Sequence, residues 1–162
     1  MHAFMLRLAG GIMMLASFFV LNGCGGNKAP AIEASNLLDA SQTLNLSQPN
    51  KPTLVVFWAT NCSSCIEEIP SIISLQKHYG DKIHIVAVAM SFDDPITLKN
   101  FVIQRQLPYP VTHDTSGDIA LGFGKIFVTP TNLLLSPEGK IVWKNVGDLD
   151  KVTLKKRIDE ML

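Results

Sequence analysis

The sequence predicts an α/β fold in which helices flank a mixed central sheet. Two segments, Thr53–Thr60 and Ile83–Met90, are rich in β-branched and aromatic residues without polar alternation, which is typical of strands buried on both faces. Helical apolar spacing follows each of them, and the chain closes with a hairpin and a helix. This alternation indicates a sandwich of helices and sheet, and 162 residues with 47% hydrophobic content suit one compact domain.

The other elements follow from local signals. A helix begins at Asn61 or Cys62, carries an apolar stripe and should kink at Pro70. Asp94 and Pro95 supply the cap and first turn of a second helix. The remaining expected elements are short strands at Leu37–Leu38 and Leu44–Leu46, which form an N-terminal β extension, an extended piece at Pro108–Val111, a short helix at Gly117–Leu121, strands at Thr131–Leu135 and Lys140–Lys144 around a turn, and a last helix at Leu149–Met161.

Residues 1–23 have the layout of a secretory signal peptide. Their apolar run, Leu8–Leu21, is 14 residues long, shorter than the roughly 20 residues that a membrane-spanning helix needs. A buried N-terminal helix is the alternative. The segment ends in LNGC, which resembles the lipobox of bacterial lipoproteins, so we expect Cys24 to be the lipidated first residue of the mature protein rather than a free thiol. Residues 24–35 then form a flexible tether and residues 36–162 the folded domain.

Cys62 and Cys65 are separated by two residues at the expected start of a helix. This spacing lets the two sulfurs form a disulfide. Cys62 would lie at the positive end of the helix dipole, so we expect its thiol pKa to fall well below the ~8.5 of free cysteine and its thiolate to attack. Cys65 would lie one turn further in and act as the resolving thiol. Glu68 shares the helical face of Cys65 and either exchanges a proton with it or is a solvated acid, whereas Glu67 is rotated toward the surface.

Three other interpretations of the cysteine pair remain open at this point. The two residues can be ordinary core cysteines. They can bind zinc or copper, but such a site needs three or four ligands, and of the histidines only His113 lies in an expected loop, with His84 in a strand and His78 near a helix end. A peroxide-reducing thiolate needs a neighbouring positive group, and nothing in the sequence places Arg105 there.

The motifs together resemble the TlpA/ResA-like thiol-disulfide oxidoreductases, which are membrane-tethered bacterial members of the thioredoxin superfamily. The resemblance runs from about Asn36 to the C-terminus and rests on FWAT before the cysteines, on Glu68, and on VTPT leading into LLLSPEGKIV. It implies a thioredoxin-like fold, a cis Thr129–Pro130 bond opposite the disulfide, and a substrate-binding surface that includes Trp58, Thr129 and Pro130. It also favours a proton-transfer role for Glu68.

The sequence departs from the common family pattern at three places. Asn61 stands where a tryptophan usually precedes the first cysteine. Val56 stands where thioredoxins carry a buried aspartate, and Glu68 is a candidate substitute for that aspartate. Ser63 and Ser64 replace the Gly-Pro of thioredoxin, which leaves the reduction potential and the direction of exchange open.

The resemblance implies an enzyme that needs no cofactor or metal and exchanges disulfides with envelope proteins. We expect a reductant that is re-reduced by a DsbD-type membrane protein and that serves cytochrome c maturation or another envelope pathway. A copper-binding or thiol-sensing module and a peroxiredoxin-like peroxidase are the alternative functions. Equal numbers of basic and acidic residues, 14 each, give no indication of nucleic-acid binding, and we expect a monomer. The lipid-anchored protein would face the periplasm or the cell exterior. Gly25, which follows the lipidated cysteine, leaves open whether the anchor lies in the inner or the outer membrane.

Overall fold

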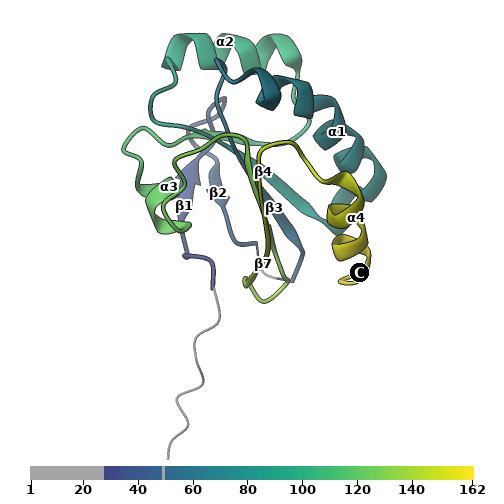
Figure 1. Cartoon of the computed structure of the whole chain (residues 1–162). Coiled ribbons are helices and arrows are strands. Elements are labelled where there is room, and N and C mark those ends of the chain that lie inside the picture. The colour runs from purple at the N-terminus through teal and green to yellow at the C-terminus, as the bar shows by residue number, and fades with distance from the viewer. Residues whose placement is uncertain (1–27, 49) are drawn as a thin grey trace, which may run out of the picture.

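A five-stranded mixed sheet forms the centre of the molecule (Figure 1). The computed structural model describes residues 28–48 and 50–162, so the predicted signal peptide and Cys24 lie outside the described residues. The strand order is β5-β4-β3-β6-β7, with parallel pairs β3/β4 and β4/β5 and antiparallel pairs β3/β6 and β6/β7. The strands are β3 (Thr53–Trp58), β4 (His84–Ala89), β5 (Val111–His113), β6 (Thr131–Leu135) and β7 (Ile141–Val146).

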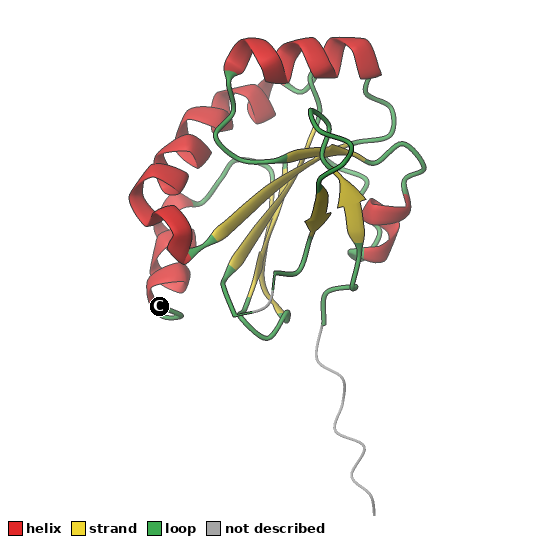
Figure 2. Cartoon of the chain, turned by 180° about the vertical axis from the view of Figure 1, so that it is seen from behind, coloured by secondary structure: helices red, strands yellow, loops and turns green. Residues whose placement is uncertain are grey.

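Helices and a small second sheet cover the two faces of the central sheet. One face packs against three helices, α1 (Ser63–Tyr79), α2 (Pro95–Arg105) and α4 (Lys151–Asp159). The opposite face packs against α3 (Asp118–Gly122) and against the antiparallel pair β1 (Glu33–Ser35) and β2 (Thr43–Asn45), which the view from behind shows beside each other (Figure 2). A short 3-10 helix, η1 (Gly80–Lys82), follows α1. The predicted mixed sheet flanked by helices is therefore confirmed.

Strand β3 lies in the middle of the sheet and connects the two cores. All six of its residues are buried. Leu54, Val56 and Trp58 belong to the core under α1, whereas Val55 and Phe57 belong to the core under α3, as the alternation of a strand requires. The carboxyl end of β3 leads directly into the loop before α1, and this connection fixes the position of the two cysteines.

The N-terminal segment differs from the prediction. The first strand is Glu33–Ser35, inside the expected tether, and not Leu37–Leu38. Ala29 is also buried, and Lys28 forms a β-bridge with Lys140, so the tether expected over residues 24–35 packs on the domain from Lys28 onward. The alternation that would reveal β1 covers only a few residues, and two of them are small, so the sequence gives a weak strand signal there.

Several observed element boundaries differ from the predicted ones by a few residues. Strand β5 begins at Val111 rather than Pro108, because prolines lack the N–H that a ladder needs. His113 is consequently the last residue of a strand and does not lie in a loop. The helix α1 passes through Pro70 as one element, and the predicted kink stays a prediction. The last helix begins at Lys151 instead of Leu149. Over the described ranges, no helix combines the length and apolar character needed to cross a bilayer.

Candidate active site at the start of helix α1

Cys62 and Cys65 form a disulfide at the N-terminal end of α1, with an S–S distance of 2.12 Å. Cys62 is the N-cap of the helix, and its Sγ accepts a hydrogen bond from the backbone N–H of Cys65 at 3.2 Å. The first N–H groups of a helix have no partner within the helix, which leaves them free to bind this sulfur. After reduction, the same donors and the helix dipole would stabilise a thiolate on Cys62.

The two sulfurs differ in their access to solvent. Cys62 is half-buried, whereas Cys65 is 3% exposed and belongs to the core under α1. An incoming thiol or disulfide therefore reaches Cys62 first. This difference fits the predicted roles of Cys62 as the attacking thiol and Cys65 as the resolving thiol.

A buried aspartate fixes the loop that precedes the disulfide. Asp93 lies after β4 and is 5% exposed. Its carboxylate accepts hydrogen bonds from the backbone N–H of Thr60, at 2.8 Å, and from the Thr60 hydroxyl. These contacts tie the end of β4 to the segment two residues before Cys62. Sequence reasoning missed Asp93 because the adjacent Asp94 gives the helix-capping signal, and Asp94 does cap α2 through the N–H of Thr97 at 2.8 Å.

The Thr129–Pro130 bond is cis, as the family resemblance implied. In the β3/β6 register Phe57 pairs with Thr131, so the bond lies next to the end of β3 from which the chain leads to Cys62. Thr129 is half-buried and Pro130 is buried. Two exposed apolar side chains precede them in the same loop, Phe127 at 76% and Val128 at 57%. Sequence reasoning did not single out these two residues, although two apolar residues directly before a Thr-Pro step were a visible signal.

Trp58 does not lie on the surface that the sequence predicted for it. The side chain is 3% exposed and packs against Phe101 of α2, with ring centroids 5.5 Å apart. Arg105 lies over the other aromatic ring of this stack, 5.2 Å from the centroid of Phe101. Because β3 runs through the middle of the sheet, Trp58 points into the core under α1. The exposed position expected for Trp58 is therefore not observed, and its role in substrate binding stays a prediction.

Glu68 is a buried acid on the same helix face as Cys65. It is 6% exposed, and its Oε1 accepts a hydrogen bond from Nδ2 of Asn132 at 2.7 Å. Its Oε2 is buried without a partner among the described residues. Burial raises the pKa of Glu68 from 4.5 to about 7, the hydrogen bond from Asn132 opposes this rise, and the negative charge of Asp148 adds to it. The interpretation of Glu68 as a solvated acid is therefore wrong, whereas Glu67 is exposed as predicted.

Asn132 is a second residue of the site that sequence reasoning missed. It lies in β6, is fully buried and pairs in register with Val56, which occupies the position of the thioredoxin aspartate. The buried polar groups next to this position are a carboxyl on α1 and an amide on β6. A single amide within a run of strand leucines was the available signal.

A cavity of about 200 Å³ lies beside Glu68, between α1 and the segment that joins β7 to α4. Glu68 forms part of its wall, so the inner carboxyl is close to solvent on this side. The other lining residues are Ser64, Glu67, Ser71, Asp148, Leu149 and Lys151.

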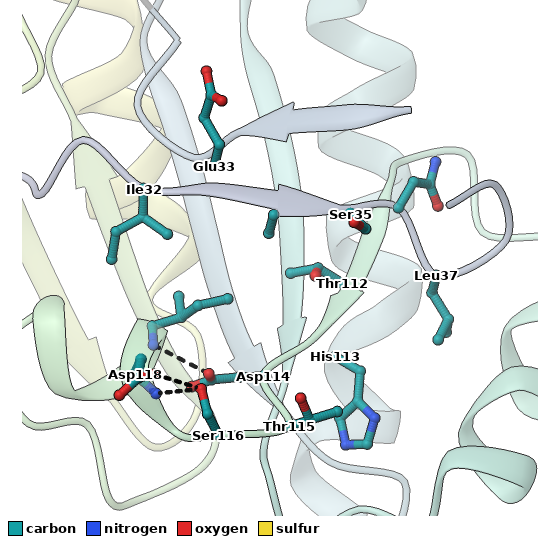
Figure 3. Close-up of a pocket in the computed structure, with 13 residues that line it drawn as sticks. Ile32, Glu33, Ser35, Leu37, Thr112, His113, Asp114, Thr115, Ser116 and Asp118 are labelled. Atoms are coloured by element: carbon teal, nitrogen blue, oxygen red, sulfur yellow. Dashed lines mark hydrogen bonds between the residues drawn. The ribbon is translucent and has the colours of Figure 1, made fainter. Parts of the chain in front are cut away.

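A larger cavity, of about 580 Å³, lies between β1 and the segment from β5 to α3 (Figure 3). Its lining includes neither cysteine nor Glu68. Asp114, which is 2% exposed, accepts hydrogen bonds there from the N–H groups of Ile119 and Ala120 at 3.1 and 2.8 Å. These bonds satisfy both carboxylate oxygens, so Asp114 serves the start of α3.

The described residues contain no group of three or more His, Cys, Asp or Glu side chains that could hold a metal ion. His113 and His84 lie in different strands, and each has a buried Nε2 without a partner in the part of the chain that the structure describes. These two histidines do not form a metal-ligand set with the two cysteines of the disulfide. The chemistry that the described residues do assemble is therefore a CxxC disulfide with a buried acid one helical turn beyond its inner cysteine.

This fold and this site define the class: a thioredoxin-like protein whose reactive group is a CxxC disulfide at a helix N-terminus. The sequence profile of the Redoxin family matches residues 25–162, so the chain belongs to the Redoxin family. Within it, the chain is ResA-like. It is 31% identical over 112 residues to the thiol-disulfide oxidoreductase ResA of Bacillus thuringiensis subsp. konkukian (strain 97-27), which covers 68% of this chain and 64% of that protein.

Two further relatives extend the match. The thioredoxin-like protein YneN of Bacillus subtilis (strain 168) is 29% identical over 136 residues, covering 83% of this chain and 78% of that protein. A thioredoxin-like protein from Neisseria meningitidis, determined in solution, has a TM-score of 0.75 at 29% identity and covers 84% of this chain and 90% of its own. The chain thus spans a little under two thirds of the ResA protein and most of the other two.

Proposed function

We propose that the protein is a lipid-anchored thiol-disulfide oxidoreductase that reduces disulfides of envelope proteins. The observation that carries the proposal is the unequal disulfide at the start of α1, with Cys62 half-buried and Cys65 buried. The ResA-like character of the chain supports the same reaction. The exposed Phe127 and Val128 next to the cis bond offer an apolar surface on which a client segment can lie beside Cys62.

The reaction proceeds in two exchanges. The Cys62 thiolate attacks one sulfur of the client disulfide, and the other client sulfur leaves as a thiolate. Cys65 then gives its proton to the Glu68 carboxylate and attacks Sγ of Cys62. The mixed disulfide breaks, the second client sulfur leaves as a thiolate, and the Cys62–Cys65 disulfide forms again. Two electrons have passed from the protein to the client, and an external dithiol restores the reduced state.

Glu68 suits the proton exchange because its pKa is raised to about 7. Near neutral pH, a group with this pKa holds a proton about as often as it lacks one, so it can both accept and return the proton of Cys65. The three-residue spacing on α1 keeps the carboxyl on the helix face of Cys65.

The proposal includes an envelope location and a membrane partner. The signal-peptide layout and the lipobox-like sequence before Cys24 support export and lipidation. A DsbD-type membrane reductase is the proposed electron donor, and cytochrome c maturation is the proposed pathway. Substituting C24S should release the protein from the membrane fraction and abolish incorporation of labelled fatty acid, whereas unchanged membrane association would contradict lipidation at this residue.

Two cysteine variants test the reaction. With insulin as a model disulfide, C62S should lose reduction by at least about a thousandfold, because no attacking thiolate remains. C65S should instead accumulate a covalent complex with insulin that dithiothreitol releases, because the resolving step is blocked. A C62S protein that still reduces insulin, or a C65S protein that turns over normally, would contradict the assigned roles.

The reduction potential of the Cys62/Cys65 couple tests the direction of exchange. Equilibration in defined thiol buffers should give a value near or below the thioredoxin value of about −270 mV if the protein is a reductant. A value near about −120 mV would make it an oxidant and would direct the search for partners toward newly secreted thiols. Titration of the reduced protein with Cu(I) and Zn²⁺ provides the control, since stoichiometric metal binding without exchange would favour a metal-binding module.

A further inference from the structure

Two amide side chains lie side by side on the sheet face beneath α1; Asn132 is buried and Asn145 is half-buried. In the antiparallel registers, Asn132 of β6 pairs with Val56 of β3 on one side and with Asn145 of β7 on the other. Residues that pair in this way place their side chains on the same face of a sheet. Val56 belongs to the core under α1, so both amides face that helix, and Glu68 reaches one of them.

The polar atoms in this cluster are rich in acceptors. Glu68 Oε2, Asn132 Oδ1 and Asn145 Oδ1 are buried acceptors that have no hydrogen-bond partner in the described part of the chain. An ionised carboxyl adds only acceptors, whereas a protonated carboxyl has one O–H donor. Since unpaired buried polar atoms are costly, the acid form of Glu68 supplies the donor that the neighbouring amide oxygens lack.

We propose that Asn132 is a positioning residue for Glu68, and that its amide holds the carboxyl in one orientation beside Cys65 both with and without the exchanged proton. This inference rests on the proposed proton exchange between Cys65 and Glu68. An amide suits the task because it carries a donor and an acceptor. Nδ2 donates to the carboxylate, and Oδ1 is available to the carboxylic acid.

The role of the amide follows from the path of the proton when an external thiol reduces the Cys62–Cys65 disulfide again. When an external thiolate attacks Sγ of Cys62, the S–S bond breaks and its electron pair goes to Sγ of Cys65. The proton of Glu68 moves to this sulfur, which leaves Cys65 as a thiol and Glu68 as a buried carboxylate. The hydrogen bond from Asn132 is the direct contact that stabilises this new charge. In the resolving step the proton returns to Glu68.

Other titratable groups also face Glu68. On α1 these are Cys65 and the exposed Glu67. Tyr109 is buried near it, and the negative charge of Glu68 contributes to a raised pKa of Tyr109 after the larger effect of burial. Asp148 and Lys151 line the neighbouring cavity from the segment between β7 and α4. These charges act through an open cavity where solvent screens them, whereas Asn132 acts through a buried hydrogen bond of 2.7 Å.

A matched pair of variants isolates the hydrogen bond. Threonine and valine have nearly the same shape and both favour strands, but N132T keeps a hydroxyl donor and N132V does not. The readout is the side-chain carboxyl ¹³C shift of Glu68, followed against pH in the oxidised full chain. The wild-type midpoint should lie near 7. We expect N132V to raise it by roughly one to two pH units, because the carboxylate loses its donor, and N132T to raise it by clearly less.

The neighbouring amide provides the control. N145V removes the half-buried amide of the same sheet face, for which no hydrogen bond to Glu68 is present among the described residues. It should leave the Glu68 midpoint within about 0.3 pH units. An unchanged midpoint in N132V, equal shifts in N132V and N132T, or an equal shift in N145V would each overturn the assignment of Asn132.

Kinetics separates this inference from the proposed function. The resolving step is measured as the rate at which the reduced protein releases its client from the mixed disulfide. In N132V the pH midpoint of this rate should shift by the same number of pH units as the midpoint of the Glu68 carboxyl titration. In E68Q the rate of the resolving step should lose this pH dependence. If E68Q keeps the wild-type pH profile, the proton exchange at Glu68 fails as a function. The carboxyl titration still decides whether Asn132 holds Glu68.

Discussion

Glu68 and Asp114 are two buried acids on opposite faces of one sheet, and they differ in how fully their oxygens are hydrogen-bonded. Glu68 is 6% exposed and Asp114 is 2% exposed. Each oxygen of Asp114 accepts a backbone N–H from the start of α3. Glu68 has one donor, from Asn132, and its second oxygen has no partner in the described ranges. Two acids with similar burial can therefore differ in how many of their oxygens are hydrogen-bonded.

The positions of the two acids explain this difference. Asp114 precedes α3 by four residues, and two of the first N–H groups of that helix, which need acceptors, donate to its two oxygens. Glu68 lies in the second turn of α1, where backbone N–H groups already bond within the helix. Its carboxyl has to find a donor on another element, and the sheet offers one amide. The carboxyl at α1 therefore has one oxygen without a donor in the described part of the chain, whereas both oxygens of the carboxyl before α3 are hydrogen-bonded.

The largest expected effect on stability comes from Asp114. Substituting D114A leaves two buried N–H groups without acceptors and should lower the free energy of unfolding by about 2 to 5 kcal/mol. D114N keeps one acceptor and should lose about half as much. Urea denaturation of the oxidised protein measures both. The rate at which Cys62 reduces insulin should be unchanged at a temperature where the variants are folded, and a loss of exchange there would show that the two regions are not independent.

The next effect depends on pH and comes from Glu68. The folded-state pKa of about 7 lies above the ordinary value of 4.5, so the folded protein holds a proton that the unfolded chain releases. The contribution of this group to stability is fully present below about pH 4.5 and is lost as the pH rises through 7. At ~1.4 kcal/mol per pH unit, the loss approaches roughly 3 kcal/mol by about pH 8.

E68Q should remove this dependence. The free energy of unfolding of E68Q minus that of the wild type should rise by roughly 3 kcal/mol as the pH increases from about 4 to about 8. Urea denaturation of the oxidised proteins measures this difference. Carboxylates elsewhere in the chain are common to both proteins and cancel in the difference. E67Q, which changes an exposed neighbour, is the matched control and should follow the wild-type curve. A difference between E68Q and the wild type that is constant with pH would mean that Glu68 titrates normally.

The sequence predicted those parts of the site whose signals are local. The spacing of Cys62 and Cys65 defined the disulfide, the run at Thr53–Thr60 defined the buried strand before it, and the three-residue step to Glu68 defined its helix face. Each of these depends on residues within one or two elements. The cis Thr129–Pro130 bond came from the family resemblance, because an X-Pro step by itself does not reveal its isomer.

The missed parts depend on contacts between distant residues. Asn132 and Glu68 are 64 residues apart, and Asp93 and Thr60 are 33 apart. Their contacts follow from the order and register of the strands, which the sequence pattern does not give. The burial of Trp58 was missed for the same reason, because it depends on α2 packing against β3. β1 was misplaced because it pairs with β2 over only three residues.

The smallest effect that sharpens the comparison comes from Tyr79, which joins α1 to α4 on the same face as Glu68. Its hydroxyl donates to Oδ1 of Asp159 at 2.7 Å, and the side chain is 5% exposed. Y79F should cost about 1 kcal/mol, as a single intramolecular hydrogen bond does. Burial, together with Asp159, raises the pKa of Tyr79 to about 12, so its phenol keeps its proton at neutral pH.

The loss in Y79F should therefore be the same at about pH 5 and about pH 8, unlike the change in E68Q. Urea denaturation at the two pH values tests this, with exposed Lys156, whose ion pair with Glu160 measures 3.9 Å, giving the baseline variant K156A. A Y79F cost that grows with pH would mean that the face under α1 responds to pH as a whole. A constant cost assigns the pH dependence to the carboxyl of Glu68.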